Sequence, residues 1–306
     1  MTWELIVAGL LVGTLVGMTG MGGGSLMTPL LVLVFNFNPA VAIGTDIAHG
    51  AIFKSIGAVQ HRRMGNVQAR LSGWMFLGSA PMSLVGVWLA WWLEKTYGGG
   101  VESTMGRVLG AALLFGSVGL LARSLVRSKG DRDKPFLLTP RDRVAAVLIG
   151  FLGGFVVGLT SVGSGVFFGL TLLVVFPLRA HKVVGTDIFH AAALLFVAGL
   201  GHWVAGNVDL GAVGWLLLGS IPGVLLGGRL TLSIPESPLR MVMAAVLGLS
   251  GLKLIEVPGG GLVVVLVACV GAVTFLVYLA SRTWVRHHRP PAVATREEPA
   301  LVDRTD

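Results

Sequence analysis

Residues 44–49 read Gly-Thr-Asp-Ile-Ala-His and residues 185–190 read Gly-Thr-Asp-Ile-Phe-His, so one polar hexapeptide recurs at an offset of 141 positions. At this offset residues 17–86 align with residues 158–227 without a gap, and 25 of the 70 aligned positions are identical. Shared apolar composition does not explain this number, because many identities fall on glycine and polar positions. The sequence therefore predicts two related halves that arose by duplication.

The composition predicts that most of the chain lies in lipid. Apolar side chains make up 54% of the 306 residues, charged ones 12%, and the mean hydropathy is +0.82, whereas soluble domains contain roughly 25% charged residues. The net charge of +8 comes mainly from short loops beside apolar spans, as membrane topology requires, so we expect no nucleic-acid partner. Cys269 is the one cysteine and lies in no metal-type pattern. We expect no metal and no cofactor.

The pattern of apolar stretches predicts an all-α polytopic membrane protein with two repeats in the same order. The first repeat spans residues 1–126 and the second 144–257, joined by a charged cytoplasmic loop at 127–143. In each repeat a glycine-interrupted stretch precedes three helices, at 5–35, 40–60, 71–93 and 104–126, and at 144–178, 182–203, 210–230 and 239–256. One extra transmembrane helix is expected near 261–283, within 258–285, and a disordered cytoplasmic tail at 286–306.

Charge placement distinguishes two paths for the interrupted stretches. If each crosses the bilayer once, the Lys and Arg residues outside the spans divide evenly, 11 on each side. If each enters and leaves on the same side as a re-entrant hairpin, 19 lie on one side, and only Lys95, Arg107 and Lys253 lie on the other. Because cytoplasmic loops carry an excess of Lys and Arg, the hairpins are favoured.

With hairpins, each half has an odd number of full crossings, and the two repeats lie inverted in the membrane. We expect the protein to lie in the inner membrane of a bacterial cell. The amino terminus then faces outward, and the central loop and the carboxyl tail face the cytoplasm. Proteins of this organisation hold their substrate near the midplane where the halves meet. We therefore look for the site at the two interruptions.

Each interruption contains glycines at a point where a short helix can begin. Such a helix start presents unpaired N–H groups and a partial positive charge, and glycine lets an anion approach the backbone closely. Packing or bending of helices is the alternative role for such glycines. The candidate substrate-binding residues here are Thr19, Gly22, Gly23, Gly24 and Ser25 in the first half and Thr160, Gly163, Ser164 and Gly165 in the second.

The repeated hexapeptide adds ionisable groups to the predicted helices. Asp46 and His49 are three residues apart and share one helix face, as do Asp187 and His190. Ionisable groups inside a membrane usually mark a pathway, a proton relay or a pairing partner. Proton coupling is one interpretation, since imidazole titrates near neutral pH, and capping or acceptance of backbone N–H bonds from the neighbouring hairpin is the other.

Three further polar residues lie in or near these helices. Thr45 and Thr186, from the same hexapeptide, are included among the candidate substrate-binding residues. Lys54 has Leu195 as its counterpart and breaks the symmetry of the halves. An intramembrane lysine needs a partner, so Lys54 is expected to bind the substrate anion, to pair with an aspartate of the hexapeptide, or to extend toward the interface.

The doubled set of motifs resembles the sulfite exporter TauE/SafE family, also called the toluene sulfonate uptake permeases. The resemblance covers residues 5–283 and rests on the glycine-rich breaks, the two hexapeptides, the Gly-Asn-Val turns and the Gly-Ser-x-Pro elements, at 20–25, 161–165, 44–49, 185–190, 65–67, 206–208, 78–81 and 219–222. It implies a permease for sulfite or another organosulfur anion. The two half-sites are not equivalent, because Gly23 is matched by Ser164 and Lys54 by no cation.

The leading interpretation is a secondary transporter that exports such an anion by alternating access. The sequence contains no GxxxxGK[ST] motif, so a gradient, with protons as a candidate partner, must supply the energy. An intramembrane enzyme that uses Asp46 and Asp187 as a carboxylate pair is a second interpretation, and a metal-cation carrier with Asp and His ligands is a third. The expected partners are a small sulfur-containing anion and the lipid bilayer; the oligomeric state stays open.

Overall fold

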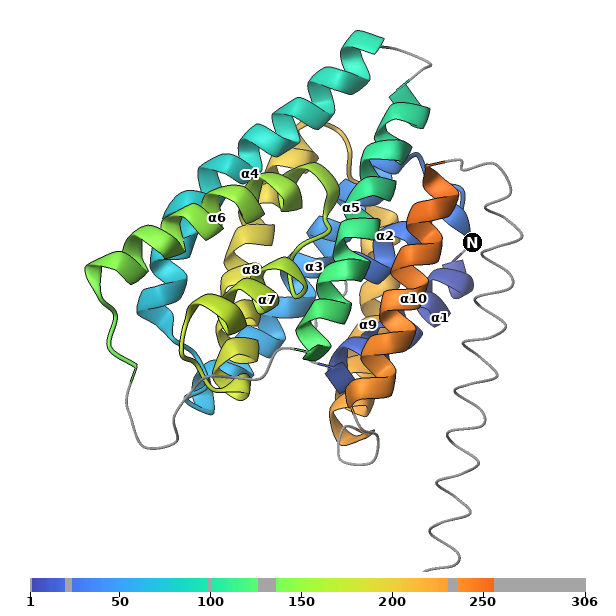
Figure 1. Ribbon diagram of the computed structural model, residues 1–306. Coiled ribbons are helices and arrows are strands. Elements are labelled where there is room, and N and C mark those ends of the chain that lie inside the picture. Colours follow the sequence, from blue (N-terminus) through green and yellow to red (C-terminus); the bar gives the residue numbers. More distant parts are fainter. Residues whose placement is uncertain (1, 20–23, 98–100, 126–135, 231–235, 256–306) are drawn as a thin grey trace, which may run out of the picture.

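The computed structural model describes residues 2–19, 24–97, 101–125, 136–230 and 236–255. All regular structure in these residues is helical (Figure 1). The first half contains α1 Thr2–Thr19, α2 Gly24–Leu33, α3 Pro39–Arg63, α4 Ala69–Tyr97 and α5 Val101–Leu125. The second contains α6 Pro140–Thr160, α7 Phe167–Val175, α8 Ala180–Val204, α9 Leu210–Leu230 and α10 Glu236–Leu254. The predicted all-α class is confirmed, and the helix expected near 261–283 lies outside the described residues.

The local sequence explains where several helices begin and end. Asn38 accepts a hydrogen bond from the N–H of Ala40 at 2.9 Å, and proline occupies the first position of α3. Helix α6 begins at Pro140, before the expected start at 144, because Thr139 and Asp142 form a reciprocal capping box. The glycines of the two Gly-Asn-Val turns, Gly65 and Gly206, have φ of +69° and +79°, which stops α3 and α8.

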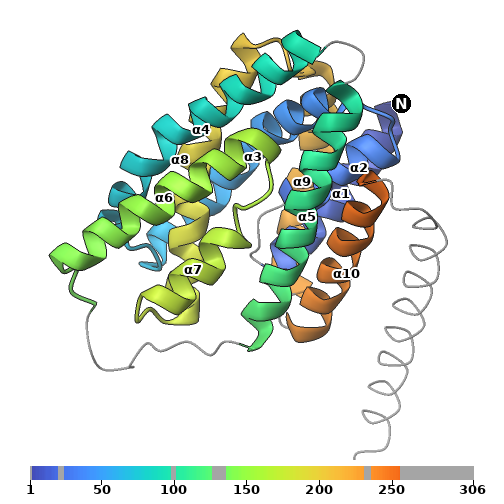
Figure 2. The same ribbon diagram turned by 45° about the horizontal axis from the view of Figure 1, so that its top comes forward.

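Helix lengths agree with a membrane environment. Within the described residues, five segments are long and apolar enough to span a bilayer: Ala69–Thr96, Thr104–Arg123, Pro140–Thr160, Ala180–Val204 and Leu210–Gly227. Helices α2 and α7 have only 10 and 9 residues, about 15 Å, or half of the hydrocarbon core. After α6 the chain turns back, so that α7 returns toward the end where α6 began (Figure 2).

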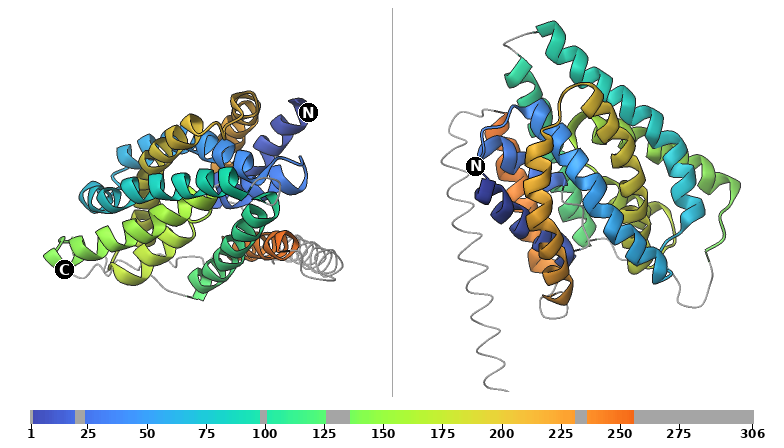
Figure 3. Two further views of the ribbon diagram at one scale, coloured as in Figure 1. Left: turned by 90° about the horizontal axis from the view of Figure 1, so that it is seen from above. Right: turned by 180° about the vertical axis from the view of Figure 1, so that it is seen from behind.

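The two halves are assembled by exchange. Helix α1 packs along α9 of the other half, and α6 packs along α4; the long α4–α6 pair is visible in Figures 1 and 2. The counterparts α3 and α8 pack on each other, as do α5 and α10. Seen from behind, α9 crosses over α1 and α3 lies between the two exchanged pairs (Figure 3). These main pairings are unchanged when the halves are swapped, as expected for a duplicated unit.

Glycine stripes allow the exchanged helices to touch backbone to backbone. Gly9, Gly13 and Gly17 of α1 face the backbone of α9, and their counterparts in α6, 141 positions later, face the backbone of α4. A Cβ atom at Gly13 would lie 2.5 Å from the carbonyl oxygen and 2.7 Å from the Cα of Ser220. Small residues at such a spacing are the usual means of close helix packing in lipid, where no hydrophobic effect drives helices together.

Substituting alanine in a stripe should destabilise the fold. We expect Gly13→Ala to lower the free energy of unfolding by about 1–3 kcal/mol, because the added methyl group forces α1 away from α9. Gly73→Ala is the matched control, since no atom lies within 4 Å of a Cβ at that position. Reversible unfolding in mixed detergent micelles measures both. Equal stability of the two variants would show that the stripe does not set the helix separation.

Candidate functional site

The second glycine break forms a buried loop between α6 and α7. Ser161 ends α6 with φ of +61°, and Gly163 and Gly165 have φ of +137° and +94°, a region that favours glycine. The hydroxyl of Thr160 donates to the carbonyl of Val156 at 2.7 Å and accepts from the N–H of Val162 at 3.3 Å. Thr160, one of the predicted substrate-binding residues, therefore stabilises the turn itself.

Asp46 of α3 is held by hydroxyl groups from both halves. Its carboxylate accepts hydrogen bonds from Thr28 of α2 at 2.5 Å and from Ser161 at 2.7 Å, and a further one from the N–H of Thr28. The side chain is 1% exposed. Only the bond from the N–H of Thr28 is of the backbone type that the sequence suggested for Asp46, and Asp46 lies inside α3 and not at its start, where it could cap the helix. The two hydroxyl donors add Thr28 and Ser161 to the site.

Lys54 lies two turns after Asp46 on the same helix and is 3% exposed. Its ammonium group donates to the hydroxyl of Ser164 in the loop of the other half, and its charge acts on both Asp46 and Asp187. Of the three roles expected for Lys54, the structure excludes extension to the membrane surface and places the residue within reach of the aspartates.

Asp187 of α8 has different partners from its counterpart Asp46. The charges of Arg123 and Lys54 act on its carboxylate, and the N–H of Gly165 donates to it. Oδ1 of Asp187 is buried and has no hydrogen-bond partner among the described residues. Arg123, at the end of α5, is 4% exposed and donates to the carbonyl of Gly165 at 2.5 Å.

Arg123 is one of the 19 cations that the charge count of the re-entrant arrangement places in loops outside the spans. The structure shows it buried, so this prediction is wrong for Arg123. It has no counterpart in the repeated block, so the duplication does not mark it. The only signal in the sequence is its position after a long apolar run, which equally describes a residue at the membrane surface. Contact with the broken hairpin is what draws Arg123 into the interior.

Together these side chains form a charge-balanced polar cluster, which consists of Asp46, Lys54, Arg123, Asp187, Ser161, Ser164 and Thr28. Its two carboxylates and two cations cancel when all are ionised. Burying an unpaired charge in a low-dielectric interior is costly, so each ion depends on the others. The cluster draws on both halves and lies where the broken hairpin of one meets α3 of the other.

Removing one ion should therefore destabilise the folded protein. We expect Lys54→Met to lower the free energy of unfolding by about 3–5 kcal/mol, because it leaves a buried carboxylate uncompensated. Adding Asp187→Asn should restore part of this loss by balancing the formal charge again. Lys95→Met is the control, since Lys95 is exposed and its ammonium group lies 4.8 Å from the centroid of the Trp91 ring. If the double variant loses as much as the two single variants together, the charges do not compensate each other.

The remaining residues of the hexapeptides tie one half to the other. Thr45 accepts a hydrogen bond from the N–H of Asp209 at 3.0 Å, and Thr186 accepts one from the N–H of Gln68 at 2.9 Å. The two bonds are related by the repeat: α3 binds the start of α9, and α8 binds the start of α4. Both threonine hydroxyls, which the sequence suggested as substrate ligands, accept backbone hydrogen bonds in this structure.

The histidines make an equivalent exchange. His49 Nε2 lies 2.9 Å from the hydroxyl of Ser220, and His190 Nε2 lies 2.9 Å from that of Ser79. All four side chains are buried. The serines belong to the Gly-Ser-x-Pro elements, which are retained in both halves and are among the motifs that carry the family resemblance.

A double-mutant cycle should detect this link. We expect His49→Ala and Ser220→Ala each to destabilise the protein and to be non-additive by about 1 kcal/mol, because either change removes the same buried hydrogen bond. Ser79 belongs to the other pair, so His49→Ala with Ser79→Ala should be additive. Unfolding in mixed micelles provides the free energies. Additivity of the first pair would contradict the bond.

Some predicted site residues lie at the ends of the described residues or outside them. Thr19 is the last residue of α1, and Gly24 and Ser25 are the first of α2, but their side chains lie outside the described part. Gly22 and Gly23 lie outside the described residues altogether. In the described part of the chain no three His, Cys, Asp or Glu side chains gather as a metal site would require.

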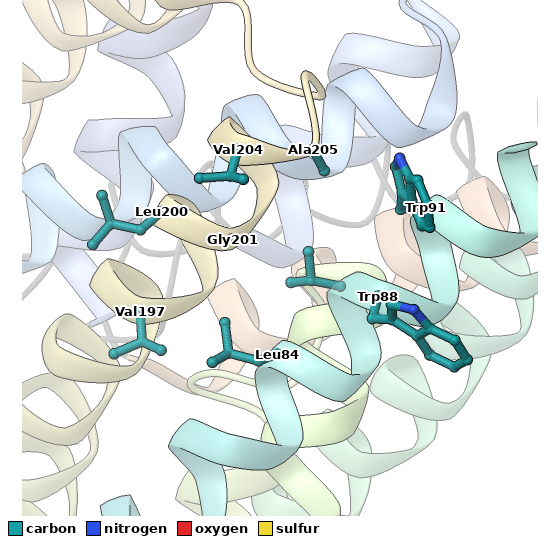
Figure 4. Close-up of a pocket in the computed structure, with 9 residues that line it drawn as sticks. Leu84, Trp88, Trp91, Val197, Leu200, Gly201, Val204 and Ala205 are labelled. Carbon is teal, nitrogen blue, oxygen red and sulfur yellow. The ribbon is translucent and has the colours of Figure 1, made fainter.

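One described hollow lies away from the cluster. It is a groove of about 650 Å³ between α4 and α8, with Trp88 and Trp91 on one wall and Val197, Leu200 and Val204 on the other (Figure 4). Its lining is mostly apolar and contains no charged side chain, so it offers lipid a surface but an anion no positive charge. We assign the functional site to the polar cluster.

A bundle of apolar helices around a buried, charge-balanced cluster defines this chain as a polytopic helical membrane protein. The sequence profile of the family described as Sulfite exporter TauE/SafE matches residues 5–254. The chain belongs to this family, and the resemblance drawn from its motifs is confirmed.

Curated relatives carry matching descriptions. The chain is 37% identical over 257 residues to "Probable membrane transporter protein YjnA" of Bacillus subtilis (strain 168), covering 83% of this chain and 100% of that protein. It is 27% identical over 253 residues to "Probable membrane transporter protein YdhB" of the same organism, covering 82% and 99%. It is 23% identical over 268 residues to "Probable membrane transporter protein MJ0441" of Methanocaldococcus jannaschii, covering 81% and 93%. No solved structure matches the chain.

Proposed function

We propose that this protein is a secondary transporter that exports sulfite or a related organosulfur anion, coupled to a proton gradient, by alternating access of its two halves. The family supports the transport of a sulfur-containing anion. The observation that carries the proposal is the buried cluster shared by the halves, in which Lys54 and Arg123 supply positive charge within a helical membrane protein. The same two cations disfavour a metal cation as cargo.

Helix directions support an inverted arrangement of the repeats. Gly44 of α3 lies near His202 of α8, whereas Gly57 lies near Ile188, so these equivalent helices run antiparallel. Helices α5 and α10 are antiparallel as well, since Gly110 approaches Gly251 and Gly116 approaches Leu247. Two copies of one unit related in this way present opposite ends to the two sides of a membrane, as in many transporters that work by alternating access. We place the amino terminus outside and the carboxyl end in the cytoplasm of a bacterial inner membrane.

The proposed route of the anion passes the buried loop between α6 and α7, where the second half contacts α3 of the first. Asp46, the histidines and the loop serines form bonds between the halves, so rocking of one half against the other must break or exchange them. The two aspartates are the proposed proton-coupling groups, because protonation of a carboxylate would restore the charge balance of the cluster when an anion enters. His49 and His190 stay candidates for the same role.

Purified protein in liposomes tests the proposal. We expect efflux and uptake of sulfite that respond to an imposed pH gradient, with thiosulfate and sulfonates as competitors and sulfate as a weaker one. Lys54→Met should abolish the flux, because the site loses a cation, whereas Lys95→Met should retain it. Anion flux that is absent under every gradient would refute transport of this class, and flux that ignores the pH gradient would refute proton coupling alone.

A further inference from the structure

The two aspartates are equivalent in sequence but have different surroundings. Thr28, which donates its hydroxyl to Asp46, is matched in the second half by Gly169. The space above Gly169 is filled by the guanidinium group of Arg123: a Cβ there would lie 2.8 Å from its Cζ. One carboxylate is therefore bound by neutral hydroxyls and the other is faced by a guanidinium.

Asymmetry extends to the lysine and to the loop. Lys54 has no cationic counterpart, and its partner Ser164 is matched by Gly23. The charges of both cations of the cluster act on Asp187, and the charge of Lys54 acts on Asp46 as well. The second half-site thus holds two positive charges around one carboxylate, and an oxygen of this carboxylate has no hydrogen-bond partner within the described residues.

Arg123 is suited to an oxyanion in particular. A guanidinium presents its N–H donors in a planar fork that matches two oxygens of one ligand, which the point charge of a lysine does not. Its position is defined by the 2.5 Å bond to the carbonyl of Gly165 and by the lack of a side chain at Gly169. The donor is thus oriented by the broken hairpin, the element that distinguishes this fold from a plain helix bundle.

Resting on the proposed transport function, we propose that Arg123 and Lys54 bind the substrate as an oxyanion at the place that the Asp187 carboxylate occupies in this structure. Asp187 is then the resident anion of an empty site, and the substrate replaces it on the two cations. Asp46, bound by the hydroxyls of Thr28 and Ser161, keeps these partners when the substrate binds in the conformation of this structure. The selected class is a small anion with at least two acceptor oxygens, such as sulfite or a sulfonate, over a halide.

Binding and transport by the full-length protein test this assignment. The apparent Kd for sulfite is read from the rise in melting temperature with sulfite concentration in detergent, and KM from flux in liposomes. Arg123→Lys keeps the charge but loses the fork, so both constants should rise about tenfold or more. Arg123→Gln should raise them further. Arg107→Gln, at an exposed arginine of the same helix, should match the parent.

Asp187→Asn provides the opposite test. Removing the resident anion should lower the apparent Kd for sulfite below that of the parent, while Asp46→Asn should not tighten binding. Chloride should not compete at the concentrations at which sulfite binds.

Three results would overturn the assignment: an Arg123→Lys variant that folds and binds sulfite as the parent does, an Asp187→Asn variant that binds it more weakly, or chloride that binds equally well. If the parent neither binds nor moves an oxyanion, the transport proposal fails and this assignment with it. If the parent transports sulfite and the Arg123 variants do too with unchanged constants, only this assignment fails.

Discussion

Charge neutrality inside a low-dielectric bundle is the constraint on which this structure depends. Asp46, Lys54, Arg123 and Asp187 are each at most 4% exposed, and none of them is tolerable alone in such surroundings. Their mutual compensation requires that α3, α5, α8 and the loop after α6 meet at one place. The broken hairpin is drawn to this point because its serines and carbonyls satisfy the ions that the helices carry.

Helix exchange makes the cluster a joint property of the halves. Since α1 docks on α9 and α6 on α4, neither repeat contains a complete set of contacts. The backbone contacts at the glycine stripes hold the exchanged pairs close, and the hexapeptides fasten α3 and α8 to the starts of the opposite helices. Movement of one half against the other would therefore change the distances between the buried ions.

Duplication predicted much of the fold but obscured part of the site. The six helices expected after the interruptions within the described residues are present near their expected positions, because apolar length and turn glycines are local properties. The hexapeptide threonines and histidines were marked by their repetition, and in the structure that repetition corresponds to bonds between the halves. Arg123, Thr28 and Ser161 were missed, because Arg123 lies outside the aligned blocks, and Thr28 and Ser161 are unrepeated residues without the charge that marked Lys54.

The sequence by itself determined that the chain is a duplicated, helical membrane protein with breaks at two glycine clusters, since hydropathy, helix length and glycine conformation follow from local composition. Tertiary structure alone decided which charges meet. An arginine after an apolar run lies at the surface or in the interior depending on what packs beside it. Arg123 can be buried because Gly169, in a helix distant in sequence, has no side chain and leaves room for the guanidinium group. Electrostatic partnership is a property of three-dimensional proximity, so the unequal surroundings of Asp46 and Asp187 appear only in the fold.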